Sequence, residues 1–260
     1  MSAAPDPGPD LATGPAGPIL QLADLHKTWD SNDRRFTLAV PDLTLARGEI
    51  VSLTGESGSG KSTLLEMVGL VSRPDGAARF MLDSGQGAVD VDAVYASGNA
   101  RLLARLRAMA VGYVVQTGAL LPFLTMAQNI RLPLRLTGRA DGGQTAHLIQ
   151  TLGLSGLEGA YPAALSIGQR QRTAIARSLV HRPPLILADE PTAALDPANK
   201  AVVIDLLVEL AQTQGATVIV ATHERDLLDR PGVRHLHVST ELGQTDGLDH
   251  VHAIVGPGHG

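Results

Sequence analysis

The sequence predicts an α/β fold with a mainly parallel sheet at its core. Short apolar runs rich in β-branched residues stand at 49–55, 185–190 and 216–223, and they alternate with segments of helical apolar spacing. The first run leads directly into a glycine-rich turn and a helix. Because strands that alternate with helices form βαβ units, we expect these strands to be parallel neighbours in one sheet.

The remaining elements follow from local patterns. Apolar alternation around Leu20, Leu22 and Leu25 predicts a first strand, and 34–49 predicts further strands. A strand at 111–115 is predicted to end at Gln116, and 83–100 is predicted to be a loop. Helices are predicted after the glycines of 56–71, at 100–109, at 125–154 with interruptions at Pro133 and Gly142–Gly143, at 166–180 and at 200–213.

Composition narrows the class of protein. The 260 residues are 44% hydrophobic and 18% charged, which is enough to bury a large core. The net charge of -5 gives no basic footprint, so we expect no nucleic-acid partner. Disulfide frameworks and thiolate metal sites are excluded because there is no cysteine. No secretory signal or apolar spanning stretch is visible, so we expect a soluble chain, with a disordered tail at 1–17.

The segment GESGSGKS fits the pattern G-x-x-x-x-G-K-[ST] and stands between a strand and a helix, where that pattern belongs. Glycines let the backbone wrap closely around phosphates, and successive N–H groups and the next helix N-terminus supply donors. Lys61 can reach the β- and γ-phosphates, and Ser62 can bind Mg²⁺. The predicted nucleotide-binding residues are Gly55, Glu56, Ser57, Gly58, Ser59, Gly60, Lys61, Ser62 and Thr63.

Two adjacent carboxylates, Asp189 and Glu190, end the apolar run LILADE. Ligands of parallel sheets bind at the carboxyl ends of the strands, so we expect both acids to lie near the phosphate loop. One acid can hold Mg²⁺, and the other can orient or deprotonate an attacking water. The alternative is a solvated strand end, which is less expected for a pair of acids beside a complete phosphate loop.

Three motifs in this order, GESGSGKST, LSIGQ and LILADEPTAALD, resemble the nucleotide-binding subunits of ATP-binding cassette (ABC) transporters over roughly residues 18–240. The resemblance implies a P-loop NTPase with an N-terminal antiparallel β subdomain and an inserted α-helical subdomain at about 117–182. The whole nucleotide-binding domain would span 18–245, followed by a C-terminal tail at 246–260. It also implies an ATPase that uses Mg²⁺ and forms a head-to-tail homodimer with two ATP molecules between the subunits.

In such a dimer the signature segment of each subunit serves the ATP of the other. By position, Ser166, Gly168 and Gln169 would face the γ-phosphate, and Asp196 would communicate across the interface. Ser166 and Gln169 also fit a capping box. We therefore expect Ile167, where the family usually has glycine, to take helical backbone in the first turn and point away from the nucleotide. Gly168 would then be the position of close approach.

The resemblance also assigns roles around the ATP. Gln116 would sense Mg²⁺ and water and link to the membrane partner, Asp189 would be the Mg²⁺-associated aspartate, and Glu190 the catalytic glutamate. His223 resembles the switch histidine that contacts the γ-phosphate, and Trp29 the aromatic that stacks on adenine. The catalytic set is thus Glu190, His223 and Gln116, and the metal set is Ser62, Gln116 and Asp189.

Some of these residues have simpler interpretations. Without the resemblance, His223 would often be a capping or surface residue at a strand end. Trp29 could simply pack within its strand. The histidines of HLH and DHVH near the C-terminus suggest metal binding, but the same spacing suits strand alternation, which we favour.

The segments LADEPT and QTGALLPFLTMAQNIRLPL look like the bacterial branch of lipoprotein-releasing and macrolide-exporting systems, although AALD and the long 83–100 segment depart from it. We therefore expect a separate integral membrane permease as partner, and a cytoplasmic chain held peripherally at the inner face of the membrane. The apolar segment TGALLPFLTM suggests a docking surface, or else packing against the helices of its own chain.

Other functions fit less well. A soluble ABC-type ATPase acting on DNA would carry long coiled coils between the phosphate loop and the signature, and no sustained heptads are present. Ribosome-associated members usually carry two cassettes. A GTPase would show N-K-x-D, which is absent, and a kinase would leave LSIGQ unexplained.

Overall fold

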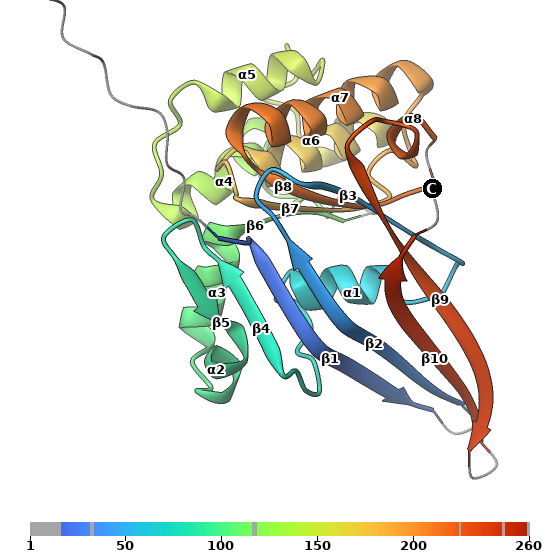
Figure 1. Cartoon of the computed structure of the whole chain (residues 1–260). Coiled ribbons are helices and arrows are strands. Elements are labelled where there is room, and N and C mark those ends of the chain that lie inside the picture. The colour runs from blue at the N-terminus through green and yellow to red at the C-terminus, as the bar shows by residue number, and fades with distance from the viewer. Residues whose placement is uncertain (1–16, 32–33, 116–118, 224, 246–247, 259–260) are drawn as a thin grey trace, which may run out of the picture.

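The computed structural model describes residues 17–31, 34–115, 119–223, 225–245 and 248–258. Its strands form one sheet in the order β5-β4-β1-β2-β10-β9-β3-β8-β7-β6 (Figure 1). The strands are β1 (Leu20–Asp30), β2 (Arg34–Leu45), β3 (Ile50–Gly55), β4 (Arg79–Asp83), β5 (Ala88–Asp90), β6 (Val111–Val114), β7 (Leu185–Asp189), β8 (Thr217–Ala221), β9 (Val233–Thr245) and β10 (Leu248–Pro257). The helices are α1 (Lys61–Val68), α2 (Val91–Ala96), α3 (Ala100–Ala110), α4 (Met126–Thr137), α5 (Gln144–Thr151), α6 (Ile167–Leu179), α7 (Pro197–Gln214) and α8 (Arg225–Leu228), with a 3-10 turn at Pro162–Ala164.

The sheet has a parallel half and an antiparallel half, which confirms the predicted fold class. Strands β9, β3, β8, β7 and β6 pair in parallel, whereas β1 pairs antiparallel with β2 and β4, and β4 with β5. Strand β10 joins the halves because it runs parallel to β2 and antiparallel to β9. The phosphate loop follows β3, a central strand of the parallel half.

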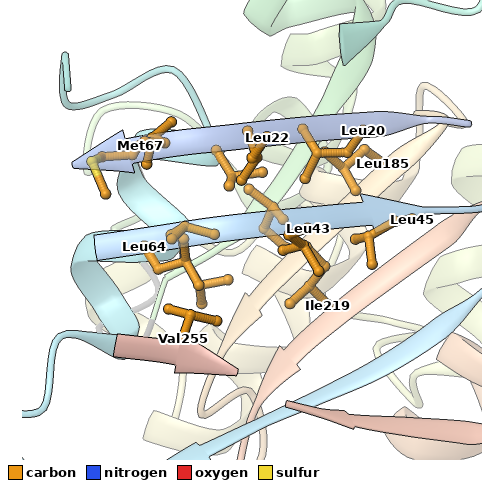
Figure 2. Packing of buried hydrophobic residues seen from close by; sticks show 14 of the residues in the cluster. Leu20, Leu22, Leu43, Leu45, Leu64, Met67, Leu185, Ile219 and Val255 are labelled. Carbon is orange, nitrogen blue, oxygen red and sulfur yellow. The ribbon is translucent and has the colours of Figure 1, made fainter. Parts of the chain in front are cut away.

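Two hydrophobic cores cover the two faces of the parallel strands. Helix α1 lies between the parallel strands and the antiparallel half (Figure 1), and Leu64 and Met67 pack there among residues of both halves (Figure 2). Helices α4 to α7 lie over the opposite face, where Ile130, Ile175 and Leu207 belong to the second core. Burying a leucine-sized side chain stabilises the fold by about 1.5–3 kcal/mol. The sheet is therefore fixed from both sides, and the loops at its edges are carried on a rigid base.

The prediction of a loop at 83–100 is wrong. This segment contains β5 and α2 and leads into α3. The carboxylate of Asp90 accepts a hydrogen bond from the N–H of Ala93 at 3.1 Å, and the side chain of Asn99 accepts one from Leu102 at 3.0 Å. Asp90 and Asn99 are N-caps that start helices, and the short apolar pair Val91 and Val94 anchors α2 in the core.

The predicted interruption at Pro133 is also wrong, since α4 continues through it to Thr137. The proline removes one helical hydrogen bond. Burial of Ile130 and Leu134 on either side, and a capping box between Thr125 and Gln128, offset that loss. The interruption predicted at Gly142–Gly143 does separate α4 from α5.

The C-terminal segment is not a tail over the described residues. Leu248–Pro257 form β10, and 34–49 contributes the single strand β2 beside it. The predicted strand alternation of the histidines is confirmed: His235 and His237 lie in β9, and their Nδ1 atoms are 2.7 Å and 3.0 Å from the hydroxyls of Ser52 and Thr54 in β3. None of the helices in the described ranges is long and apolar enough to cross a bilayer.

A buried histidine after α6 makes the stability of the fold depend on pH. Burial, and then the positive charge of Arg139, lowers the pKa of His181 to about 4. In the unfolded chain this histidine has a pKa near 6.5, so between about pH 6.5 and pH 4 it is protonated when unfolded and neutral when folded. The free energy of unfolding therefore decreases as the pH falls from about 6.5 to about 4. We expect this histidine to contribute roughly 3 kcal/mol to that loss.

Urea unfolding at pH 6.5 and pH 4.5 measures this effect. His181→Gln removes the titrating group and should show a smaller loss than the unchanged chain, whereas His147→Gln, at an exposed position, should behave like the unchanged chain. Equal losses in all three proteins would contradict the assignment.

Candidate nucleotide-binding site

A cavity of about 530 Å³ lies where the carboxyl ends of β3, β7 and β8 meet the tip of the β1–β2 hairpin. It joins groups that the sequence predicted separately: the phosphate loop, both acids of the strand end, the histidine after β8 and the tryptophan. Its lining residues are Trp29, Phe36, Ser57, Gly58, Gly60, Lys61, Ser62, Thr63, Asp189, Glu190 and His223. The parallel topology brings these side chains together, as expected for strands that end at one edge of a sheet.

The backbone of the phosphate loop requires glycine at two positions. Gly60 has a φ of 105° and precedes α1, and a Cβ there would lie 3.2 Å from the ring of Phe36. At Gly55, a Cβ would lie 2.7 Å from the Oγ of Ser59 and 2.8 Å from the carbonyl oxygen of Val238. No side chain caps the N-terminus of α1, so its first N–H groups are open to an anion.

Lys61 holds the loop closed. Its side chain is only 7% exposed, and its Nζ donates hydrogen bonds of 2.8 Å to the carbonyl oxygens of Gly55 and Glu56. The Oγ of Ser59 is buried and has no hydrogen-bond partner among the described residues. A buried lysine charge, an orphaned hydroxyl and open N–H groups fit a bound polyphosphate.

The acids stand at the edge of the same cavity. Asp189 is the last residue of β7, and Glu190 follows it with a φ of 44°, which is strained for a residue with a side chain. The N–H of Glu190 donates to the carbonyl oxygen of Ala221 at 2.9 Å, which ties this turn to the end of β8. Burial, and then the charge of Asp189, raises the pKa of Tyr113 on β6 above its usual value, so Tyr113 stays protonated.

Two aromatic rings form one wall of the cavity. Trp29 and Phe36 face each other across the β1–β2 hairpin, with ring centroids 5.8 Å apart and planes tilted by 53°. The Nζ of Lys27 lies 5.3 Å from the centroid of the Trp29 ring, and Trp29 itself is 37% exposed. Sequence reasoning missed Phe36; the hairpin register that places it opposite Trp29 is the signal that could have found it.

The signature residues do not line this cavity within one chain. Ser166 is the N-cap of α6, and the predicted capping box is present: the N–H of Gln169 donates to Ser166 Oγ at 3.2 Å, and the N–H of Ser166 donates to Gln169 Oε1 at 2.8 Å. Ile167 opens the helix and has no positive φ, as expected, and it is 64% exposed. A Cβ at Gly168 would make only ordinary contacts of 3.6 Å or more within the chain.

A further predicted residue, Asp196, also lies outside the cavity lining. Asp196 is the N-cap of α7, and hydrogen bonds from the side chain and the N–H of Asn199 hold its pKa below the usual value. Gln116 lies outside the described residues, so its role stays a prediction. Among the lining residues, His223 is exposed and follows β8.

Comparison with known proteins decides the family. The family model described as ABC transporter matches residues 38–193, more than half of the chain. The chain belongs to the ABC transporter family. ABC cassettes of this kind bind and hydrolyse ATP, and the same holds for this one.

Relatives include both exporters and importers. The chain is 36% identical to the lipoprotein-releasing system ATP-binding protein LolD of Bordetella pertussis, over 88% of this chain and 97% of LolD. It is 40% identical to the macrolide export ATP-binding/permease protein MacB of Rhodospirillum rubrum, over 82% of this chain and 32% of MacB. It is 36% identical to the methionine import ATP-binding protein MetN of Xylella fastidiosa, over 82% of this chain and 62% of MetN. The chain thus spans about a third of MacB and under two thirds of MetN.

Solved ABC cassettes share the fold. A dimeric structure of the ATP-binding cassette MJ0796, in a post-hydrolysis state with ADP and Pi, matches with a TM-score of 0.72 and 31% identity, covering 84% of this chain and 93% of MJ0796. A second dimeric structure of MJ0796 matches with a TM-score of 0.70. All of these relatives are cassettes or transporter subunits, which favours transport over action on DNA or ribosomes.

Lys61→Ala should weaken nucleotide binding by the ABC cassette. The substitution removes the buried charge and both hydrogen bonds that close the phosphate loop. Hydrogen bonds to charged groups contribute about 1.5–3 kcal/mol, so ATP affinity should fall at least tenfold. Titration with a fluorescent ATP analogue measures the loss. Lys200→Ala, which removes a lysine of α7 outside the cavity, should bind as the unchanged chain does; unchanged affinity in Lys61→Ala would show that the loop is not the site.

Proposed function

We propose that two copies of this ABC cassette close head to tail on two molecules of Mg-ATP, and that hydrolysis drives a separate integral membrane permease. One observation carries the proposal: Lys61 and Ser62 share a single cavity with the paired acids Asp189 and Glu190. Binding groups for a triphosphate and a base for water thus meet at one edge of the sheet.

Each residue of the cavity has a separate role in ATP hydrolysis. Loop N–H groups and Lys61 bind and orient the β- and γ-phosphates. Glu190 accepts a proton from the attacking water, and His223 donates a hydrogen bond to the γ-phosphate. Ser62 and Asp189 would hold Mg²⁺, with Gln116 as a further predicted ligand; the ion, when bound, neutralises phosphate charge. The wall of Trp29 and Phe36 offers a face on which adenine can stack.

The dimer supplies what one chain lacks. Ser166, Gly168 and Gln169 do not line the cavity of their own chain, while Ser166 and Ile167 lie exposed at the start of α6. A helix N-terminus is an anion site, so this end of α6 suits the γ-phosphate held by a second copy. Ser166 would cap α6 in the free chain and turn to phosphate in the dimer. The dimeric state of the MJ0796 cassettes supports the same arrangement.

An apolar groove offers a place for the permease. It has a volume of about 440 Å³ and lies between α3, α4, α6 and β6, next to the end of α1. Leu121, Leu132, Pro133 and Tyr113 are among its lining residues, and Arg107 and Arg177 also reach it. Leu136, also at the groove, is 69% exposed. Exposed apolar surface of this kind suits a partner segment.

Part of the predicted docking segment packs against helices of its own chain, and part of it is exposed, so each of the two interpretations holds for a part. Leu120 packs against the core of α4 to α7, whereas Pro122 and Phe123 are exposed and Leu121 lines the groove. The buried Asn129 holds this segment: its Nδ2 donates to the carbonyl oxygens of Leu121, Leu124 and Thr125, and its Oδ1 accepts from the N–H of Leu121 at 2.8 Å. The exposed part is therefore presented by a fixed turn.

The match to LolD over nearly its whole length supports the lipoprotein-releasing and macrolide-exporting branch. Docking on a permease of that kind would place the chain at the inner face of the membrane. Importers of methionine match at similar identity, so the transported molecule and the direction of transport do not follow from these likenesses.

Glu190→Gln should bind Mg-ATP and barely hydrolyse it, because an amide cannot accept the proton of water. With hydrolysis blocked, the ATP-bound dimer should persist. Steady-state phosphate release and size-exclusion chromatography with ATP measure both effects, with exposed Glu241→Gln on β9 as control. Loss of a general base typically costs 10²–10⁴-fold, so near-normal turnover in Glu190→Gln would reject this role.

Leu136→Asp should weaken docking on the permease without changing ATP binding, because it puts a charge into the apolar groove. The measurement is the fraction of chain that sediments with washed membranes of the native cell, with Leu242→Asp, on β9 and 82% exposed, as control. We expect a several-fold lower fraction for Leu136→Asp alone. Equal sedimentation of both variants would place the permease elsewhere and leave the ATPase assignment intact.

A further inference from the structure

A second polar cavity lies at the opposite edge of the parallel sheet. Its volume is about 410 Å³, and its lining includes Pro184, just before β7, and Ala216, just before β8. Strand β7 runs over five residues from this edge to Asp189. At about 3.3 Å per residue, the two cavities are separated by roughly 15 Å along that strand. The cavity is therefore distinct from the nucleotide site.

Three arginines from separate segments line this cavity: Arg47 before β3, Arg139 after α4, and Arg182 after α6. No carboxylate is among the described residues that line it. In a chain with a net charge of -5, three guanidinium groups around one hollow are an unusual local concentration of positive charge.

Two of the three charges are bound only to neutral groups. Arg139 donates through Nη1 to the carbonyl oxygens of His181 and Arg182. Arg182 donates through Nε and Nη2 to the amide Oε1 of Gln144, at 3.2 Å and 3.0 Å. In the described part of the chain neither guanidinium has a carboxylate partner. Both charges are held in place and left uncompensated.

The third arginine is neutralised at the edge of the cavity. Arg47 pairs with Asp83 at 2.6 Å, and the side chain of Asp83 is only 7% exposed. The Nε of Arg47 is nevertheless buried without a hydrogen-bond partner among the described residues. Arg47 is thus neutralised, and the charges without a carboxylate partner at this cavity are those of Arg139 and Arg182.

We propose that this cavity binds a small phosphate-bearing anion. An anion with two or more negative charges matches the two uncompensated charges of Arg139 and Arg182, which a single carboxylate would not. Planar guanidinium groups bind phosphate oxygens in a bidentate manner, and their internal hydrogen bonds already fix them before the ligand arrives. The adjacent prolines Pro183 and Pro184 stiffen the wall that carries Arg182.

Inorganic pyrophosphate is the probe, and the Lys61→Ala chain is used because its phosphate loop should bind phosphates only weakly. Isothermal titration at low ionic strength should show one site per chain. Arg182→Gln in that background should lower the affinity at least tenfold, since a hydrogen-bonded charge pair is lost. Arg182→Lys keeps the charge but not the planar guanidinium group, so its affinity for pyrophosphate should lie between that of the Lys61→Ala chain and that of Arg182→Gln.

Arg135→Gln is the matched control, because it removes the same charge from an exposed position on α4 outside the cavity. It should bind pyrophosphate as the Lys61→Ala chain does. Melting temperatures without pyrophosphate check that each variant is folded, and the unchanged chain saturated with Mg-ADP should show the same arginine-dependent site. Absence of binding in the Lys61→Ala chain, or equal affinity in Arg182→Gln and Arg135→Gln, would overturn the proposal.

Discussion

The burial of α1 between the two halves of the sheet fixes the geometry on which the site depends. Leu64 and Met67 on this short helix pack among residues of β1, β2, β7 and β8 (Figure 2). The phosphate loop begins at the end of β3 and runs into the first residue of α1, so it cannot move without disturbing that core. The same packing sets the distance from the loop to the acids after β7 and to the hairpin that carries Trp29. A rigid hydrophobic contact thus positions every polar group of the cavity.

The sequence was most informative where local chemistry and topology agree. The phosphate loop and the pair Asp189–Glu190 are predicted to meet because parallel strands end at one edge. Ser57, Gly58 and Gly60–Thr63 of the loop do line one cavity with both acids, whereas Gly55, Glu56 and Ser59 are not among its lining residues. The capping box of Ser166 and Gln169, and the helical backbone of Ile167, followed from residue types within one turn. Interactions of short range are visible in a single sequence because both partners lie within a few letters of each other.

What the sequence did not show depends on contacts between distant segments. Phe36 belongs to the site only because the hairpin register places it opposite Trp29. Asn129 has the pattern of an ordinary helix residue, yet four hydrogen bonds make it the support of the 121–125 turn. The sequence predicts a break at Pro133 because the cost of a proline is local, whereas the packing that offsets it is tertiary. The three arginines are far apart in the chain, and only the fold gathers them.

The position of β10 has a consequence for how the chain is made. In the register of the sheet, the backbone of Asp249 lies beside that of Arg34. Strand β10 is therefore inserted between β2 and β9. During synthesis the β1–β2 hairpin is made long before β10, so it lacks this neighbour until Leu248–Pro257 have left the ribosome. Pairings of such long sequence separation close late and slowly. Until then the edges of β2 and β9 expose unpaired N–H and C=O groups, so the nascent chain carries strand edges that can pair incorrectly with other chains.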